Sequence, residues 1–136
     1  MTEMTAALED LGLSPRARCV LMTALEGEFT QIEIARMIGV DKTTMVVTLD
    51  ELERVGLAER RPSSKDRRAR VIAVTAKGKA MVRKGGEVVK RVQDEVLETL
   101  PAKERAALVD GLQRLVSERL AEPAQCASPV RRRRAA

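Results

Sequence analysis

Residues 30–54 read TQIEIARMIGVDKTTMVVTLDELER, and this stretch decides the fold. Thr30 and Glu33 have the capping-box spacing, in which a hydroxyl and a carboxylate each bond a free backbone amide, so a short helix is predicted to begin there. A turn containing glycine follows, and Asp41 is placed to cap a second helix that runs to about Arg54. Two short helices joined in this way are typical of a helix-turn-helix, although an ordinary α-hairpin has the same pattern.

A charged β-hairpin is predicted directly after these helices. Residues 57–61 and 70–74 have strand-like sequences, and the polar loop 62–68 separates them. A basic hairpin after a helix-turn-helix indicates a winged helix, so the predicted fold class is mainly α with a small β-hairpin (α+β). In such proteins the second helix of the pair enters the major groove of DNA. The hairpin then reaches phosphates or the minor groove beside it.

Further helices are predicted on both sides of this segment. Ser14, followed by a proline, is typical of a helix entrance, and Gly27 is expected to end that helix in a left-handed conformation. A long helix is expected after Thr75, with a bend or a close backbone approach at Gly85 and Gly86. The last predicted helix carries an apolar stripe that needs a partner, and a second copy of the chain is the simplest one. Its inward residues are Leu108, Leu112, Leu115 and Val116.

The composition excludes several classes of function. The 136 residues include one aromatic residue, Phe29, so base-stacking platforms for single-stranded nucleic acid are ruled out. Histidine is absent from the sequence, and no catalytic or metal constellation is visible, so we expect neither an enzyme nor a cofactor. The two cysteines, Cys19 and Cys126, lie too far apart for a local zinc knuckle. No signal peptide or membrane span is predicted, which favours a cytoplasmic protein without a membrane partner.

Positive charge is concentrated in two places. The net charge is +5, and four arginines at 131–134 lie in the terminal tail. Within residues 60–70 a single acidic residue, Asp66, stands among six basic ones, which are Arg60, Arg61, Lys65, Arg67, Arg68 and Arg70. A basic cluster on a nearly neutral body indicates that a polyanion is bound at one defined surface, although a solvated loop has the same composition.

The order and spacing of several motifs resemble the MarR family of winged-helix transcriptional regulators. The matching pieces are TQIEIA (30–35), GVDKTTM (39–45), LERVGLAERR (52–61), DRR (66–68), VIAVT (71–75) and KG (77–78). This resemblance implies a homodimer built from the terminal helices, which binds a palindromic double-stranded DNA operator. It also implies release by a small-molecule effector or an oxidant near the dimer seam, as in a ligand-responsive repressor.

The resemblance also implies a domain organisation. We expect a shortened N-terminal helix in the dimer seam (1–12), a winged helix-turn-helix DNA-binding domain (13–75), dimerisation helices (76–120) and a disordered basic tail (121–136). Family members carry a longer first helix than this chain has room for before Leu13, and they often have a polar residue where Val46 and Val47 stand. Base contacts are therefore expected to be unusually apolar.

The candidate DNA-binding residues lie at the start of the second helix and in the hairpin. They are Gln31, Lys42, Thr43, Thr44, Val47, Arg60, Lys65, Arg67, Arg68 and Arg70. Threonines and Val47 are expected to meet base edges and thymine methyl groups, with Thr44 altering operator preference. Arg67 or Arg68 is expected to enter the minor groove, and most other hairpin cations to contact phosphates. Asp66 is expected to pair with a neighbouring arginine and shape the turn.

Two further interpretations complete the sequence analysis. Cys19 is expected to be a buried apolar thiol rather than a sensor, because it adjoins Val20 on a helix and has no histidine nearby. An alternative function is a winged-helix protein-interaction module that anchors non-specifically to DNA through its basic tail. Such a polycation would lose affinity steeply with salt and would show little operator preference.

Overall fold

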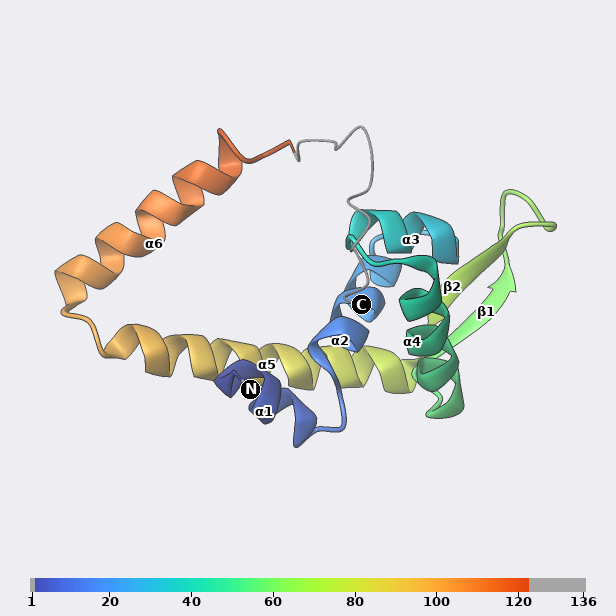
Figure 1. Cartoon of the computed structure of the whole chain (residues 1–136), viewed down its shortest axis with the longest axis horizontal. Helices are drawn as coiled ribbons and strands as arrows, with labels where there is room; N and C mark the ends of the chain where they lie inside the picture. The colour runs from blue at the N-terminus through green and yellow to red at the C-terminus, as the bar shows by residue number, and fades with distance from the viewer. Residues whose placement is uncertain (1, 123–136) are drawn as a thin grey trace, which may run out of the picture. The chain divides into compact units, whose positions relative to one another are not determined.

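The computed structural model describes residues 2–122, and the tail arginines and Cys126 lie outside these residues. Within that range the helices are α1 (Glu3–Glu9), α2 (Pro15–Leu25), α3 (Gln31–Met37), α4 (Lys42–Arg54), α5 (Ala76–Glu98) and α6 (Ala102–Ser117). The strands are β1 (Ala58–Pro62) and β2 (Arg70–Val74), between α4 and α5 (Figure 1). The predicted fold class, mainly α with one β-hairpin, is confirmed.

The local signals of the helix-turn-helix act as the sequence predicts. The Thr30 hydroxyl accepts from the Glu33 amide, and the Glu33 carboxylate accepts from the Thr30 amide at 2.7 Å, so the capping box is complete. The Asp41 carboxylate accepts from the backbone amide of Thr44 at 2.9 Å at the start of α4. Gly39 has φ +70°, which allows the tight turn between α3 and α4.

The predicted left-handed cap at Gly27 is wrong. The residue after α2, Glu26, keeps a right-handed backbone with φ −77°, and its amide donates to the carbonyl of Thr23. Gly27 is not among the residues with positive φ in residues 2–122, and its α-carbon faces the ring of Phe29. The chain therefore leaves α2 through a right-handed turn, whereas the left-handed conformation occurs at Gly12, Gly39 and Gly56, after α1, α3 and α4.

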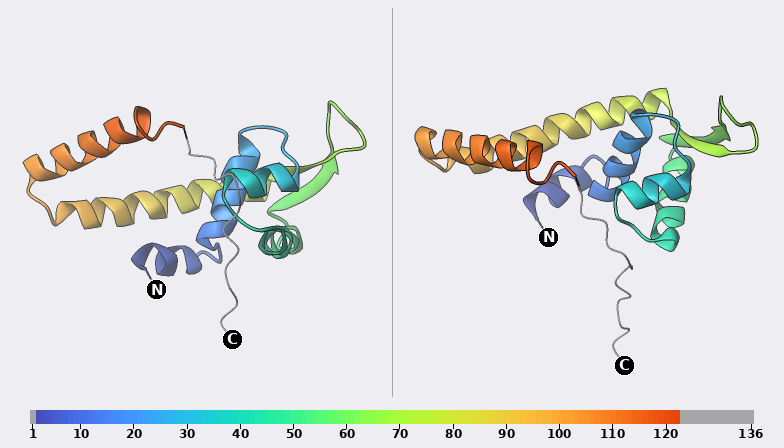
Figure 2. Two further views of the ribbon diagram at one scale, coloured as in Figure 1. Left: turned by 45° about the horizontal axis from the view of Figure 1, so that its top comes forward. Right: turned by 90° about the horizontal axis from the view of Figure 1, so that it is seen from above.

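The hairpin is an antiparallel pair that is attached to the segment before α3. Arg60 of β1 stands opposite Ile72 of β2, and the Ile72 amide donates to the Phe29 carbonyl at 2.9 Å. Hairpin residues 58–74 are here called the wing, and residues 63–69 its tip. Figure 2 shows the tip extending beyond the helices.

The core of residues 2–95 lies between α2, α3, α4 and the base of the wing. Its most buried side chains are Leu13, Val20, Leu21, Ile34, Met45, Leu49, Leu52, Leu57 and Ile72. Met45, Leu49 and Leu52 recur at helical spacing, as predicted, so α4 buries one face and leaves the other free.

The first part of α5 belongs to this same compact unit. Met81 and Val82 pack against its core, and the unit extends to residue 95. The Thr75 hydroxyl accepts from the Gly78 amide, which confirms the predicted cap. A close approach also occurs at Gly85, where an added Cβ would lie 3.1 Å from Leu13, although α5 is one continuous helix.

The second compact unit contains α6. None of its residues is buried, and its apolar side chains are exposed: Leu108 44%, Leu112 53%, Leu115 51% and Val116 62%. These are the residues that the sequence predicts to face a partner. In the described part of the chain, no helix combines the length and the apolar character that crossing a bilayer requires.

Candidate nucleic-acid interface

The free face of α4 begins at its N-terminus. Lys42 and Thr43 are exposed in the first turn, and Val47 is 65% exposed one turn further on. Met45 and Leu49, on the opposite face, are fully buried. Burial of one face therefore fixes the rotation of α4 and presents Thr43 and Val47 together to solvent, whereas Lys42 is exposed at the N-terminal end of the helix.

The two threonines at the start of α4 have different roles. Thr44 donates its hydroxyl to Asp41 at 2.6 Å and its backbone amide to the same carboxylate. These bonds, the hydroxyl first, lower the pKa of Asp41 below its ordinary value. Among the hydrogen bonds found within residues 2–122, none involves the Thr43 hydroxyl. Thr43 is consequently the threonine that is available to a ligand, which argues against the predicted base contact by Thr44.

The wing tip is shaped by Asp66 through the backbone. Its carboxylate accepts from the amide of Arg68 at 2.9 Å, and its carbonyl accepts from the amide of Ala69 at 3.0 Å. The expected pairing of Asp66 with an arginine side chain is not found among the ion pairs of the described residues. The turn needs only the backbone bonds, which leaves the side chains of Arg67 and Arg68 exposed, as are Lys65 and Arg70.

Glu28 holds the base of the tip, a role that no pattern in the sequence predicts. Its carboxylate accepts from the Ser63 hydroxyl at 2.9 Å, the Ser64 amide at 3.0 Å and the Ser64 hydroxyl at 2.9 Å. These bonds, that of Ser63 foremost, lower the pKa of Glu28. Glu28 and Ser63 are 35 positions apart in the sequence, so no local pattern signals the contact. The tip therefore has a fixed attachment to the segment before α3.

Arg60 lies against acidic residues of α4. Its guanidinium donates to Asp50 at 2.9 Å, to Glu53, and to the Gln31 side-chain carbonyl at 3.3 Å. The side chain is 28% exposed. This geometry argues against the predicted contact of Arg60 with phosphate. Gln31 also takes part in this network through its oxygen, which leaves its amide nitrogen as the group that could donate to a phosphate.

Two hollows lie beside the helix-turn-helix. One, of about 220 Å³, brings the predicted residues Gln31 and Lys42 together between α3 and α4, and Arg36 also lines it. Arg36 is exposed at the end of α3, which is the first helix of the pair. In such motifs the first helix crosses the DNA backbone. It is an additional cation of this surface that the motif search missed.

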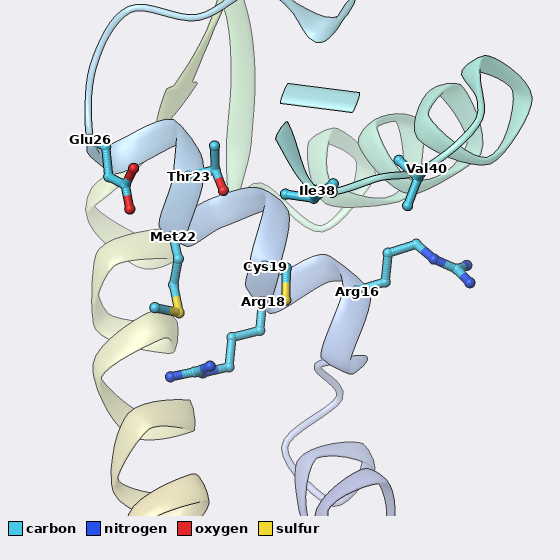
Figure 3. A pocket seen from close by; sticks show the side chains of 8 residues that line it. All are labelled: Arg16, Arg18, Cys19, Met22, Thr23, Glu26, Ile38 and Val40. Carbon is cyan, nitrogen blue, oxygen red and sulfur yellow. The ribbon is translucent and has the colours of Figure 1, made fainter. Parts of the chain in front are cut away.

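The second hollow, of about 490 Å³, lies along α2 (Figure 3), and Cys19 is part of its lining. Cys19 is exposed, so the prediction of a buried thiol is wrong. The buried stripe of α2 contains Val20, Leu21 and Ala24. At about 100° per residue, Cys19 lies roughly 100° to 160° around the helix from each of these three side chains, so it is on the face turned away from the core.

Comparison with known proteins places this site in a family. A family model described as "MarR family" matches residues 11–69. The fold is similar to that of apo MarR from Escherichia coli, with a TM-score of 0.76 and 24% identity over 83% of this chain and 85% of that chain. The transcriptional repressor CouR bound to a 23-mer DNA duplex has a TM-score of 0.70 and 29% identity, over 84% and 82% of the two chains. CouR from Rhodococcus jostii RHA1 bound to p-coumaroyl-CoA has a TM-score of 0.68 and 29% identity, over 90% and 84%.

These findings confirm the resemblance that the motifs indicate. Residues 11–69 match the model of the MarR family, whose members are DNA-binding transcriptional regulators, and the fold is that of winged helix-turn-helix proteins.

Proposed function

We propose that this chain is a homodimeric regulator of transcription that binds a palindromic double-stranded DNA operator. The observation that carries the proposal is the exposed start and free face of α4: Lys42 is exposed at the N-terminal end, and Thr43 and Val47 on the free face, beside a basic wing with a fixed base. In winged helix-turn-helix proteins this arrangement inserts the recognition helix into the major groove while the wing follows the adjoining backbone. CouR, a MarR-like repressor of 29% identity, is bound to a DNA duplex.

Each exposed side chain has a role in this proposal. Thr43 and Lys42 contact base edges at the N-terminal end of α4, and Val47 packs on a thymine methyl group. Arg67 and Arg68 supply the wing contact in the minor groove, where the potential is most negative. Phosphates are contacted by Lys65, Arg70 and the Gln31 amide. Thr44, Asp66 and Arg60 hold the interface in shape and do not touch DNA.

The dimer is proposed from the unpaired apolar face of α6. Leu112 and Val116 are more than half exposed although they are large and apolar, and a stripe of such residues at helical spacing marks an interface. With a two-fold axis the two α4 helices reach half-sites about one helical turn apart, roughly 10 base pairs between centres. In this organisation residues 13–75 bind DNA, and 76–120 dimerise together with the short segment 1–12.

A small-molecule effector at the dimer seam completes the proposal, with repression released when the ligand binds. CouR, a repressor by description, is also bound to p-coumaroyl-CoA, which supports a ligand-responsive mode for a chain of this similarity.

Selection of bound sequences from random duplexes tests the proposal. The expected result is a recovered dyad whose halves lie about one helical turn apart, with footprints on both halves. Recovery of sequences without a dyad would refute the dimeric operator. Binding without sequence preference and with steep salt dependence would instead favour the alternative of an interaction module with non-specific DNA anchoring.

A further inference from the structure

Arg60 connects the wing to both helices of the helix-turn-helix through its side chain. Arg60 belongs to β1, and its side chain reaches Asp50 and Glu53 on α4 and Gln31 on α3. The connection is reinforced by the backbone, because the Arg60 amide donates to the second oxygen of Glu53 at 2.9 Å. Three elements that are separate in the sequence thus meet at one guanidinium.

The chemistry of the group suits this role. A guanidinium is a planar fork of five donors, so it can bond two carboxylates and an amide at once, which a lysine ammonium cannot do in the same geometry. Arg60 and Glu53 are both about two-thirds covered, with 28% and 32% of their side chains exposed. The neighbouring Arg61 is exposed and makes no ion pair within residues 2–122.

The position of this cluster matters for DNA recognition. The proposed base contacts come from α4, whereas the proposed minor-groove contacts come from the wing tip. A duplex fixes the distance between its grooves, so these contacts form together only if α4 and the wing keep one relative position. Small misplacements of contacting groups remove much of the discrimination between correct and wrong bases.

We propose that Arg60 is a positioning residue for sequence discrimination: it locks the wing against α4 without touching DNA. The inference rests on the proposed function, since it assumes that α4 and the wing contact the same duplex. The sequence groups Arg60 with the DNA-binding cations, whereas in this inference its charge pairs with Asp50 and Glu53.

The test compares two duplexes of equal length, the one selected by the wild-type protein and a scrambled version. For each variant, dissociation constants are measured for both duplexes over a range of salt concentrations. The variants are Arg60→Ala and Arg60→Lys, with Arg61→Ala and Arg61→Lys as matched controls of the same residue type one position further along. Thermal unfolding of each variant gives the fraction of folded protein.

Positioning predicts a specific pair of results. The ratio of the dissociation constant for the scrambled duplex to that for the selected duplex falls roughly tenfold in both Arg60 variants, because one or more base contacts are misplaced. The dependence of log affinity on log salt stays as in the wild type for Arg60→Ala, because no phosphate contact is lost. The Arg61 variants keep the wild-type ratio.

Other results overturn the inference. A salt slope that decreases by about one in Arg60→Ala would show that Arg60 neutralises a phosphate. If Arg60→Ala raised the dissociation constants for both duplexes by the same factor, Arg60 would have a role in folding alone. If Arg60→Ala fails to fold, the ratio of dissociation constants for Arg60→Lys tests the inference, because lysine retains the positive charge but lacks the planar set of guanidinium donors.

The acidic partners of Arg60 give a second test, in which negative charge is removed instead of positive charge. Asp50→Asn and Glu53→Gln remove negative charge from α4, so electrostatics alone would strengthen binding to both duplexes and leave their ratio unchanged. Positioning predicts instead that the ratio falls in both variants. Absence of any preference in the wild-type protein would refute the proposed function, whereas a wild-type preference that survives all these substitutions would refute only this inference.

Discussion

The carboxylate of Glu28 and the hydroxyl of Ser63 lie 2.9 Å apart across the base of the wing. Ser63 is buried, and the same carboxylate also accepts two hydrogen bonds from Ser64. The basic tip thus carries its charges on a loop that is held at its base by an anion. This anchor makes the attachment of the wing tip depend on the ionisation of Glu28.

The first prediction is that the wing loosens in acid. The pKa of Glu28 is lowered below its ordinary value of 4.5, chiefly by Ser63, so its ionised form stabilises the folded wing. This contribution is present above pH 4.5 and is lost as the pH falls through the lowered native value. Protection factors of the amides in residues 63–69, measured by hydrogen exchange, should decrease as the pH falls across that window. In Glu28→Gln the same amides should already be less protected at neutral pH, and their protection factors should not change across the window.

The second prediction separates Thr43 from Thr44. Thr43→Ala should change the preferred base at one position of each half-site, with a cost of about 1 kcal/mol or more for the original operator. Thr44→Ala should leave base preference unchanged and lower the unfolding midpoint, because its hydroxyl bonds Asp41. Selection from random duplexes with each variant measures base preference, and thermal unfolding of each variant measures the midpoint. A changed preference for Thr44→Ala would contradict the assignment.

The third prediction uses two glycines of α5. A Cβ at Gly78 would lie 2.0 Å from the Leu57 carbonyl oxygen, whereas a Cβ at Gly86 would have no neighbour within 4 Å. Gly78→Ala should lower the free energy of unfolding by roughly 3 kcal/mol, since backbone must move to relieve the overlap. Gly86→Ala should raise it by about 1 kcal/mol through helix propensity. Urea unfolding at one protein concentration measures both, and equal effects of the two substitutions would be inconsistent with this packing.

The fourth prediction concerns the apolar face of α6. Leu112→Glu should raise the dissociation constant of the dimer by roughly a hundredfold, because a carboxylate would have to be buried without a partner. Sedimentation equilibrium measures this change. Ile32→Glu, at an exposed apolar residue of α3 with 55% exposure, is the matched control and should leave the dimer intact. A Leu112→Glu protein that remains fully dimeric would exclude this face from the interface.

Local signals predicted the elements, because they act over three or four residues. The Thr30–Glu33 box and the Asp41 cap need no knowledge of the rest of the chain, and both form as predicted. The cap assigned to Gly27 failed because a glycine after a helix permits a left-handed turn without requiring one.

The candidate site was harder to predict, because its charges are paired through tertiary contacts. Arg60 was grouped with the basic cluster, yet successive strand residues point to opposite faces, so Arg60 and Arg61 could not both face the same partner. That alternation, together with Glu53 in the last turn of the preceding helix, was the available signal. Glu28 offered none, because its partners lie 35 and 36 positions away.

The dissociation constants of the wild-type protein for the selected duplex and for its scrambled version test the central claim most directly. At physiological salt the dissociation constant for the selected duplex should be lower by roughly a thousandfold or more, as expected for direct reading of bases by α4. Equal dissociation constants for the two duplexes would contradict sequence-specific recognition by this surface.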